Sequence, residues 1–145
     1  AGVFQDAALE QYIRYMVKEL KLTDVVFFDG WQDDVNVWLQ DKHYIVSTSI
    51  GESQGMGILE GMACGLKPVI HNFPGADQIF PSEYIFNISE EFCEQVCDES
   101  YMPERYRGFV EERYSLERQL SAINKLFLHF ESEIGAGNQA VACST

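Results

Sequence analysis

Two glutamates, Glu52 and Glu60, stand with seven residues between them in a glycine-rich stretch of the chain. The first belongs to a loop of small residues, and the second belongs to the opening turns of a predicted helix. Gly55 and Gly57 lie between them and allow backbone amides to approach a ligand closely. Because the N–H groups at a helix start are free and carry partial positive charge, a phosphate suits this position. The pattern indicates a site for a negatively charged molecule that is rich in hydroxyl groups.

The two carboxylates are suited to different tasks at such a site. An acidic residue close to a bound phosphate can accept hydrogen bonds from sugar hydroxyls, as it does with a ribose diol, and Glu60 fits this role. Glu52 would lie near the reacting sugar carbon, where a carboxylate orients the sugar or stabilises an oxocarbenium-like transition state. The alternative is that both are surface acids of an acidic protein, and their spacing alone leaves this open.

Composition limits the classes of partner. The chain of 145 residues has 46% hydrophobic residues, and its 10 basic and 23 acidic residues give a net charge of −13. Nucleic-acid binding relies on clustered Lys and Arg, so we expect no nucleic-acid partner. No run approaches the roughly 18 apolar residues of a membrane helix, and the first residues show no signal-peptide pattern. We therefore expect a cytoplasmic protein without direct membrane insertion.

The positions of the four cysteines do not predict a disulfide framework or a metal site. Cys64, Cys93 and Cys97 fall in predicted helices and Cys143 lies near the end of the chain. A metal site at Cys93 and Cys97 would need two further ligands, and no His or Cys stands at a matching distance. We expect reduced thiols and no bound metal.

Short apolar runs at residues 25–28, 44–46, 68–71 and 84–86 predict strands. The first is closed by Asp29-Gly30, which suits a buried parallel strand. Helices are expected between and after them: Asp6 is predicted to cap the first, Asp33 or Asp34 the second, and Gly65 to end a third that begins near Gly57. Three more helices are predicted at residues 90–99, 104–112 and 115–133.

This alternation of strands and helices predicts an α/β fold with a parallel sheet. The chain enters its first helix directly, as though the preceding strand were absent, so the sheet is expected to lack its first strand–helix unit. We predict one domain over residues 1–133 and a disordered tail over residues 134–145, where the residues are small and polar.

The segment from Ser49 to Ile70, Ser-Ile-Gly-Glu-Ser-Gln-Gly-Met-Gly-Ile-Leu-Glu-Gly-Met-Ala-Cys-Gly-Leu-Lys-Pro-Val-Ile, closely resembles a known motif. It is similar to the nucleotide-sugar-binding motif of the retaining glycosyltransferases of family 4, also called group 1. In that family a Glu-x7-Glu pair precedes Met-Ala-Cys-Gly-x-Pro-Val-Ile. The resemblance extends more weakly over about residues 1–130. It implies the C-terminal, Rossmann-like half of a GT-B fold, in which two such domains face each other across a cleft.

Carried over by position, the resemblance implies a role for several residues. Glu52 is similar to the first motif acid, near the donor hexose, and we assign it the catalytic role. Glu60 resembles the second acid, which binds the ribose. The remaining donor-binding residues implied for the sugar, the diphosphate and the base are Ser53, Gly55, Met56, Gly57, Gly30 and His71. For His71, a hydrogen-bonded loop residue is the alternative. The family's basic residues that neutralise the diphosphate have no counterpart in this sequence, and a loop that often ends in Gly-Gly reads Pro74-Gly75-Ala76.

The resemblance implies a retaining glycosyltransferase whose substrate is a nucleotide-diphospho-sugar and which needs no further cofactor. The acceptor is expected to bind a separate N-terminal domain, so this chain alone is expected to be inactive. The alternative from another class is a non-catalytic nucleotide-sugar-binding or interaction module that keeps the same fold.

Overall fold

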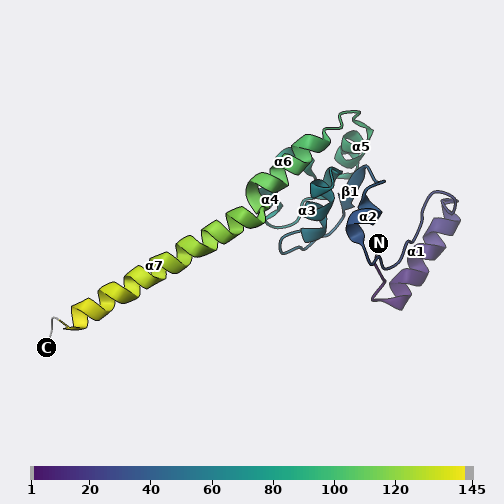
Figure 1. Cartoon of the computed structure of the whole chain (residues 1–145). Helices are drawn as coiled ribbons and strands as arrows, with labels where there is room; N and C mark the ends of the chain where they lie inside the picture. Colours follow the sequence, from purple (N-terminus) through teal and green to yellow (C-terminus); the bar gives the residue numbers. More distant parts are fainter. Residues whose placement is uncertain (1, 143–145) are drawn as a thin grey trace. The chain divides into compact units, whose positions relative to one another are not determined.

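The computed structural model describes residues 2–142 of the chain, with the side chains of residues 2–134. The chain divides into two compact units, Ala1–Asp41 (unit 1) and Lys42–Thr145 (unit 2). Figure 1 labels the helices and strands.

Unit 1 contains two helices whose starts are set by aspartates. Helix α1 spans Ala7–Glu19, and the carboxylate of Asp6 accepts hydrogen bonds from the N–H groups of Ala8 at 2.8 Å and Leu9 at 3.1 Å. Helix α2 spans Val35–Leu39 and is capped in the same way by Asp34. These caps satisfy N–H groups that a helix leaves free at its start. The capping role predicted for Asp6 is confirmed, and Asp34 is the cap of the second helix.

The strand predicted at residues 25–28 is wrong, because this segment is a turn followed by irregular backbone. Val25 is 66% exposed and Phe27 is 73% exposed, whereas a central parallel strand is buried on both faces. An apolar run forms a strand only where a neighbouring strand accepts and donates its backbone hydrogen bonds. The described residues of unit 1 include no strand that serves this purpose.

Unit 2 is built on a parallel sheet of three strands in the order β1-β2-β3. Strand β1 spans Tyr44–Ser47, β2 spans Lys67–His71 and β3 spans Ile85–Phe86. In the register of β1 and β2, Ser47 pairs with Ile70, so the two strands end almost level. The fold class predicted from the sequence, a Rossmann-like parallel α/β sheet flanked by helices, is confirmed.

Helices cover this sheet, and Figure 1 shows α3 and α6 beside each other in unit 2. Helix α3 packs on β1 and β2, α6 packs on α3 and β2, and α5 packs on β2 and β3. The apolar core between them includes Ile58, Met62, Ile70, Phe73 and Tyr106. The bounds of the helices in unit 2 are α3 Met56–Ala63, α4 Ala76–Ile79, the 3₁₀-helix η1 Ser82–Tyr84, α5 Ser89–Cys97, α6 Pro103–Tyr114 and α7 Leu116–Ala142.

Two glycines allow the close packing of α3. A Cβ atom added at Gly61 would lie 2.8 Å from the Cβ of Ile45 in β1, so a glycine is needed where the helix crosses the strand. Gly65 follows the helix with φ +89°, a left-handed conformation that favours glycine at a helix end. The helix end predicted at Gly65 is confirmed.

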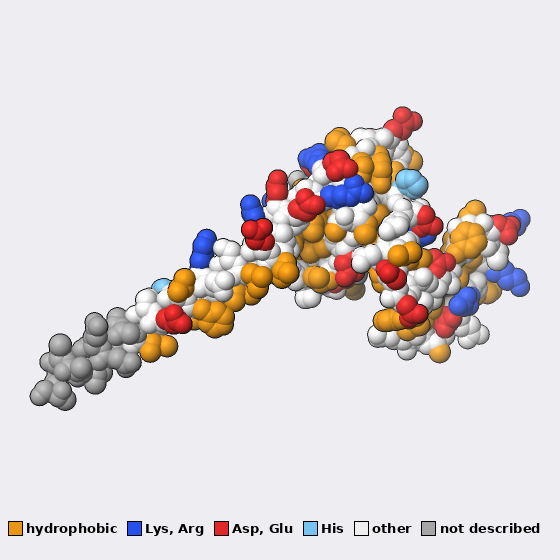
Figure 2. All heavy atoms as spheres, in the orientation of Figure 1, with side chains coloured by type: hydrophobic (Ala, Val, Ile, Leu, Met, Phe, Trp, Pro, Cys, Tyr) orange, Lys and Arg blue, Asp and Glu red, His pale blue; other side chains and the backbone are white. Residues whose placement is uncertain are grey.

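Helix α7 continues to Ala142, beyond residue 133, where the sequence predicts its end. Alanines at positions 136, 140 and 142 favour helix, whereas Gly135 and Gly137 oppose it, so residue propensities do not explain why the helix continues past the predicted start of the tail. Residues 143–145 of the predicted tail lie outside the described residues. An apolar stripe follows the helix, and orange side chains mark it in Figure 2. Its members, each at least 48% exposed, are Leu116, Leu120, Ile123, Phe127, Phe130 and Ile134.

Across the described residues, no helix combines the length and the apolar character that crossing a membrane requires.

Candidate functional site

The loops that follow β1 and β2 leave the sheet at the same edge, because parallel strands end on one side. Residues 48–55 connect β1 to α3, and residues 72–75 connect β2 to α4. In open parallel sheets, ligands bind beyond the carboxyl ends of the strands. This edge of unit 2 therefore holds the candidate site.

Helix α3 begins without a side-chain cap. Its N-cap is Gly55, which adopts φ +67° and ψ +44° and whose backbone is buried against Ile58 and Phe80. A Cβ at Gly55 would lie 3.1 Å from atoms of both side chains, so both the conformation and the space favour glycine. The carbonyl of Gly55 accepts hydrogen bonds from Ile58 and Leu59. Among the hydrogen bonds of the described residues, none uses the N–H groups of Met56 or Gly57, which are free to bind an anion.

The exposed face of α3 carries Glu60 one turn after these free amides. Met56, Gly57 and Glu60 are all exposed, whereas Ile58 and Leu59 face the core. Positions i and i+4 of a helix share a face, so Met56 and Glu60 lie on the same side. A Cβ at Gly57 would meet no atom within 4 Å, so the space in front of this backbone is open.

Glu52 and Ser53 are exposed residues of the loop before α3. Across the described residues, no hydrogen bond or ion pair engages the carboxylate of Glu52 or that of Glu60. Neither acid is used to hold the fold together, so both are available to a ligand. The ligand contacts assigned to Glu52, Glu60, Ser53, Gly55, Met56 and Gly57 stay predictions that this geometry permits.

His71 ends β2 at the same edge and is half-buried. Its Nδ1 lies 3.3 Å from the carbonyl oxygen of Ser49, and its ring meets Phe86 edge-on with 5.5 Å between the ring centroids. The hydrogen-bonded loop role, which the sequence left open beside a ligand contact, therefore has a partner in the structure. Its contact with a donor stays a prediction.

The loop after β2 is held by a polar network that the sequence analysis did not identify. The side-chain amide of Asn72 donates to Oδ1 of Asn87 at 2.8 Å, and the backbone N–H of Asn87 donates to Glu91 at 2.7 Å. The hydrogen bonds from Asn87 hold the pKa of Glu91 below its usual range. Gly75, with φ +90°, then starts α4. The contact between Asn72 and Asn87 joins residues 15 positions apart, which no local pattern of the sequence indicates.

Gly30 belongs to unit 1 and has φ +68°, which suits glycine. Its neighbour Asp29 accepts a hydrogen bond from Nε1 of Trp38 at 2.8 Å, and its carbonyl accepts one from Gln32. The segment is thus ordered within unit 1. The base contact assigned to Gly30 stays a prediction.

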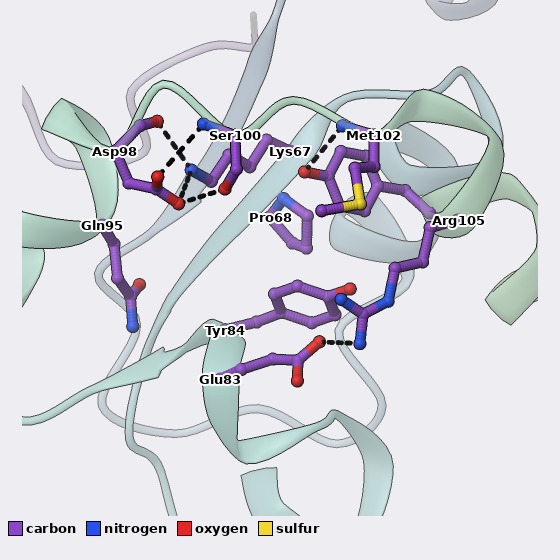
Figure 3. Close-up of a pocket in the computed structure, with 10 residues that line it drawn as sticks. Lys67, Pro68, Glu83, Tyr84, Gln95, Asp98, Ser100, Met102 and Arg105 are labelled. Carbon is purple, nitrogen blue, oxygen red and sulfur yellow. Dashed lines mark hydrogen bonds and ion pairs between the residues drawn. The ribbon is translucent and has the colours of Figure 1, made fainter.

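A pocket of about 210 Å³ lies near the opposite edge of the sheet, where β2 begins (Figure 3). Lys67 is 94% buried and donates to the carbonyl and the carboxylate of Asp98 at 3.0 and 3.1 Å. Arg105 pairs with Glu83 at 2.6 Å across the same pocket. The charged groups of this pocket pair with one another, so they serve to join α5, η1 and α6 to β2. None of the predicted site residues lines the pocket.

The described residues contain no group of three His, Cys, Asp or Glu side chains that could hold a metal ion. Cys64, Cys93 and Cys97 are free thiols, and Cys143 lies outside the described residues.

Comparison with known proteins agrees with this architecture. A search of curated proteins finds none that matches the chain. A family model, however, matches residues 1–131, which includes both glutamates, both loops and the three strands. Together with the small parallel sheet, this match is consistent with the C-terminal, Rossmann-like half of a GT-B glycosyltransferase. The chain belongs to the glycosyl transferases group 1.

Proposed function

We propose that the site at the carboxyl edge of β1 and β2 binds the sugar and diphosphate of a nucleotide-diphospho-sugar. The observation that carries the proposal is the start of α3, where, in the part of the chain that the structure describes, two N–H groups without a hydrogen-bond partner stand one turn before a carboxylate that also lacks one. Amides at a helix start bind phosphate oxygens, and a carboxylate binds the hydroxyls of a sugar. A nucleotide sugar contains both groups side by side.

In this proposal the two acids have separate roles. Glu60 accepts hydrogen bonds from the ribose hydroxyls, next to the amides of Met56 and Gly57. Glu52 lies beside the donor hexose, where its negative charge stabilises the positive charge that develops on the sugar during transfer. Ser53 contacts the sugar from the same loop.

We further propose that transfer retains the configuration of the sugar, with the departing phosphate helping to deprotonate the acceptor. The protein then contributes by orienting two substrates and by stabilising charge. The acceptor would bind a separate N-terminal domain. This chain is therefore proposed to bind donor weakly and to show no turnover by itself.

Titration calorimetry of the chain with UDP-glucose, GDP-mannose and ADP-glucose tests the binding step. We expect weak heat with at least one of them and its loss in Glu60→Gln, with Glu104→Gln, an exposed acid on α6, as the matched control. Binding that is equal in both variants would remove Glu60 from the site. Sugar transfer by this chain without any other protein would contradict the proposed need for a partner domain.

The non-catalytic module is the competing function, and turnover separates the two. In a protein that joins this chain to an acceptor-binding domain, Glu52→Gln should lower kcat more than it weakens donor binding. A module that binds without catalysing would show no transfer with any acceptor.

A further inference from the structure

Within the described part of the chain, the loop that carries Glu52 has a single hydrogen bond to a neighbouring element. Among the hydrogen bonds of the described residues, the residues 48–54 make two, and one of these is local, from the N–H of Ser49 to Oγ of Ser47 at 3.4 Å. The other joins the carbonyl of Ser49 to Nδ1 of His71 at 3.3 Å. His71 is therefore the group that ties this loop to β2.

The chemistry of the contact fixes the proton on His71. A carbonyl oxygen only accepts hydrogen bonds, so Nδ1 must carry the hydrogen in this arrangement. The ring of Phe86, in the neighbouring strand β3, meets the imidazole edge-on at 5.5 Å and limits its rotation. The imidazole is thus held on one side by an aromatic ring and on the other by the loop.

We propose that His71 is a positioning residue that holds the loop of residues 48–55 over the end of β2 and so sets the place of Glu52. The inference rests on the proposed function for its consequence, because the loop matters through the contacts of Glu52 and Ser53 with the donor. The contact itself is a property of the free protein. Through this contact, Nδ1 of His71 binds the loop rather than the nucleotide sugar.

The tautomer of His71 is the most direct test. Nitrogen-15 NMR of the imidazole distinguishes a proton on Nδ1 from a proton on Nε2. We expect the Nδ1–H form for His71 at a pH where the ring is neutral. An Nε2–H form would place two lone pairs face to face at 3.3 Å and would overturn the proposal.

Substitution tests the consequence for the loop. His71→Phe keeps an aromatic ring beside Phe86 and removes the donor, whereas His71→Asn provides an amide N–H at the position of Nδ1. We expect a glutamate-specific protease to cleave the peptide bond after Glu52 about fivefold faster in His71→Phe, because the loop must open to enter the protease and about one ordinary hydrogen bond opposes this opening. Cleavage in His71→Asn should stay near that of the original chain. His43→Phe, at an exposed histidine before β1, is the matched control and should leave the loop unchanged.

The same variants separate this inference from the proposed function. Equal rates of loop cleavage in the original chain and in His71→Phe would overturn the positioning role, whatever the chain binds. Faster cleavage in His71→Phe with rescue in His71→Asn would support it, even if calorimetry with the three nucleotide sugars showed no binding and the proposed function failed. If the chain binds one of them, His71→Phe should weaken that binding about fivefold and His71→Asn should not.

Discussion

The two glycines of α3, Gly57 and Gly61, provide a matched pair of substitutions with opposite expected effects. Both lie in the same helix and neither has a positive φ, so alanine suits the backbone at either position. Their surroundings differ. A Cβ at Gly57 meets nothing within 4 Å, while a Cβ at Gly61 meets three side-chain atoms of Ile45 at 2.8 to 3.0 Å.

The magnitude follows from two competing terms. Alanine is favoured over glycine inside a helix by about 1 kcal/mol, and by less in the first turn, where Gly57 lies. Overpacking a core contact costs roughly 1–3 kcal/mol. At Gly61 the upper part of this range applies, because the Cβ of Ile45 moves only with the backbone of β1. We expect Gly61→Ala to lower the free energy of unfolding by about 1–2 kcal/mol and Gly57→Ala to raise it by about 0.5 kcal/mol.

Urea denaturation followed by far-UV circular dichroism measures both effects. Tryptophan fluorescence is unsuitable, because both tryptophans, Trp31 and Trp38, lie in unit 1 and α3 lies in unit 2. A denaturation midpoint for Gly61→Ala equal to or above that of the original chain would refute the packing argument. A marked loss of stability in Gly57→Ala would refute the assignment of open space in front of that residue.

Three further predictions concern the site and the opposite edge of the sheet. In the proposed site Gly57→Ala places a methyl group before the free amides, so calorimetry should show weaker binding of a nucleotide sugar in a protein that is no less stable. Hydrogen bonds from Ser100 and then Lys67 lower the pKa of Asp98 to about 2 from 3.8, so Asp98 contributes stability that is present above pH 4 and is lost as the pH falls towards 2. Asp98→Asn should flatten that part of the stability curve in acid denaturation, and an unchanged slope would contradict the assignment. Lys67→Met replaces a buried cation with an apolar side chain of similar length and leaves Asp98 exposed to water. Unfolding in urea should therefore show a smaller loss of the free energy of unfolding for Lys67→Met than for Lys67→Ala, because the alanine also opens a cavity.

Local patterns predicted the part of unit 2 that carries the site. Alternation of apolar runs with helical segments gave β1, α3 and β2, and the glycine after α3 gave its end. These features depend on a few neighbouring residues, such as the left-handed Gly65. The same is true of the free start of α3, because a glycine N-cap offers no side chain to occupy the amides.

The features that the sequence did not predict depend on distant partners. The run at residues 25–28 has the composition of a strand, but a strand exists only beside another strand. The contacts of His71 with Ser49 and of Asn72 with Asn87 join residues 22 and 15 positions apart, and no periodic pattern in the sequence indicates them. Such a hydrogen bond forms only after the fold has brought a donor and an acceptor from distant parts of the chain close together.

The charge at the proposed site has a consequence for where donor affinity arises. Residues 47–63 contain two glutamates and neither lysine nor arginine, in a chain of net charge −13. The described cations of residues 67–113 are held elsewhere, over aromatic rings or in contact with acidic side chains: Lys67, Arg105, Arg107 and Arg113. A diphosphate approaching α3 therefore meets amide dipoles but also the repulsion of Glu52 and Glu60, which acts over about 8 Å at physiological salt. In the proposed function, this segment selects the sugar through its hydroxyls, while most of the attraction for the diphosphate must come from cations outside residues 47–63.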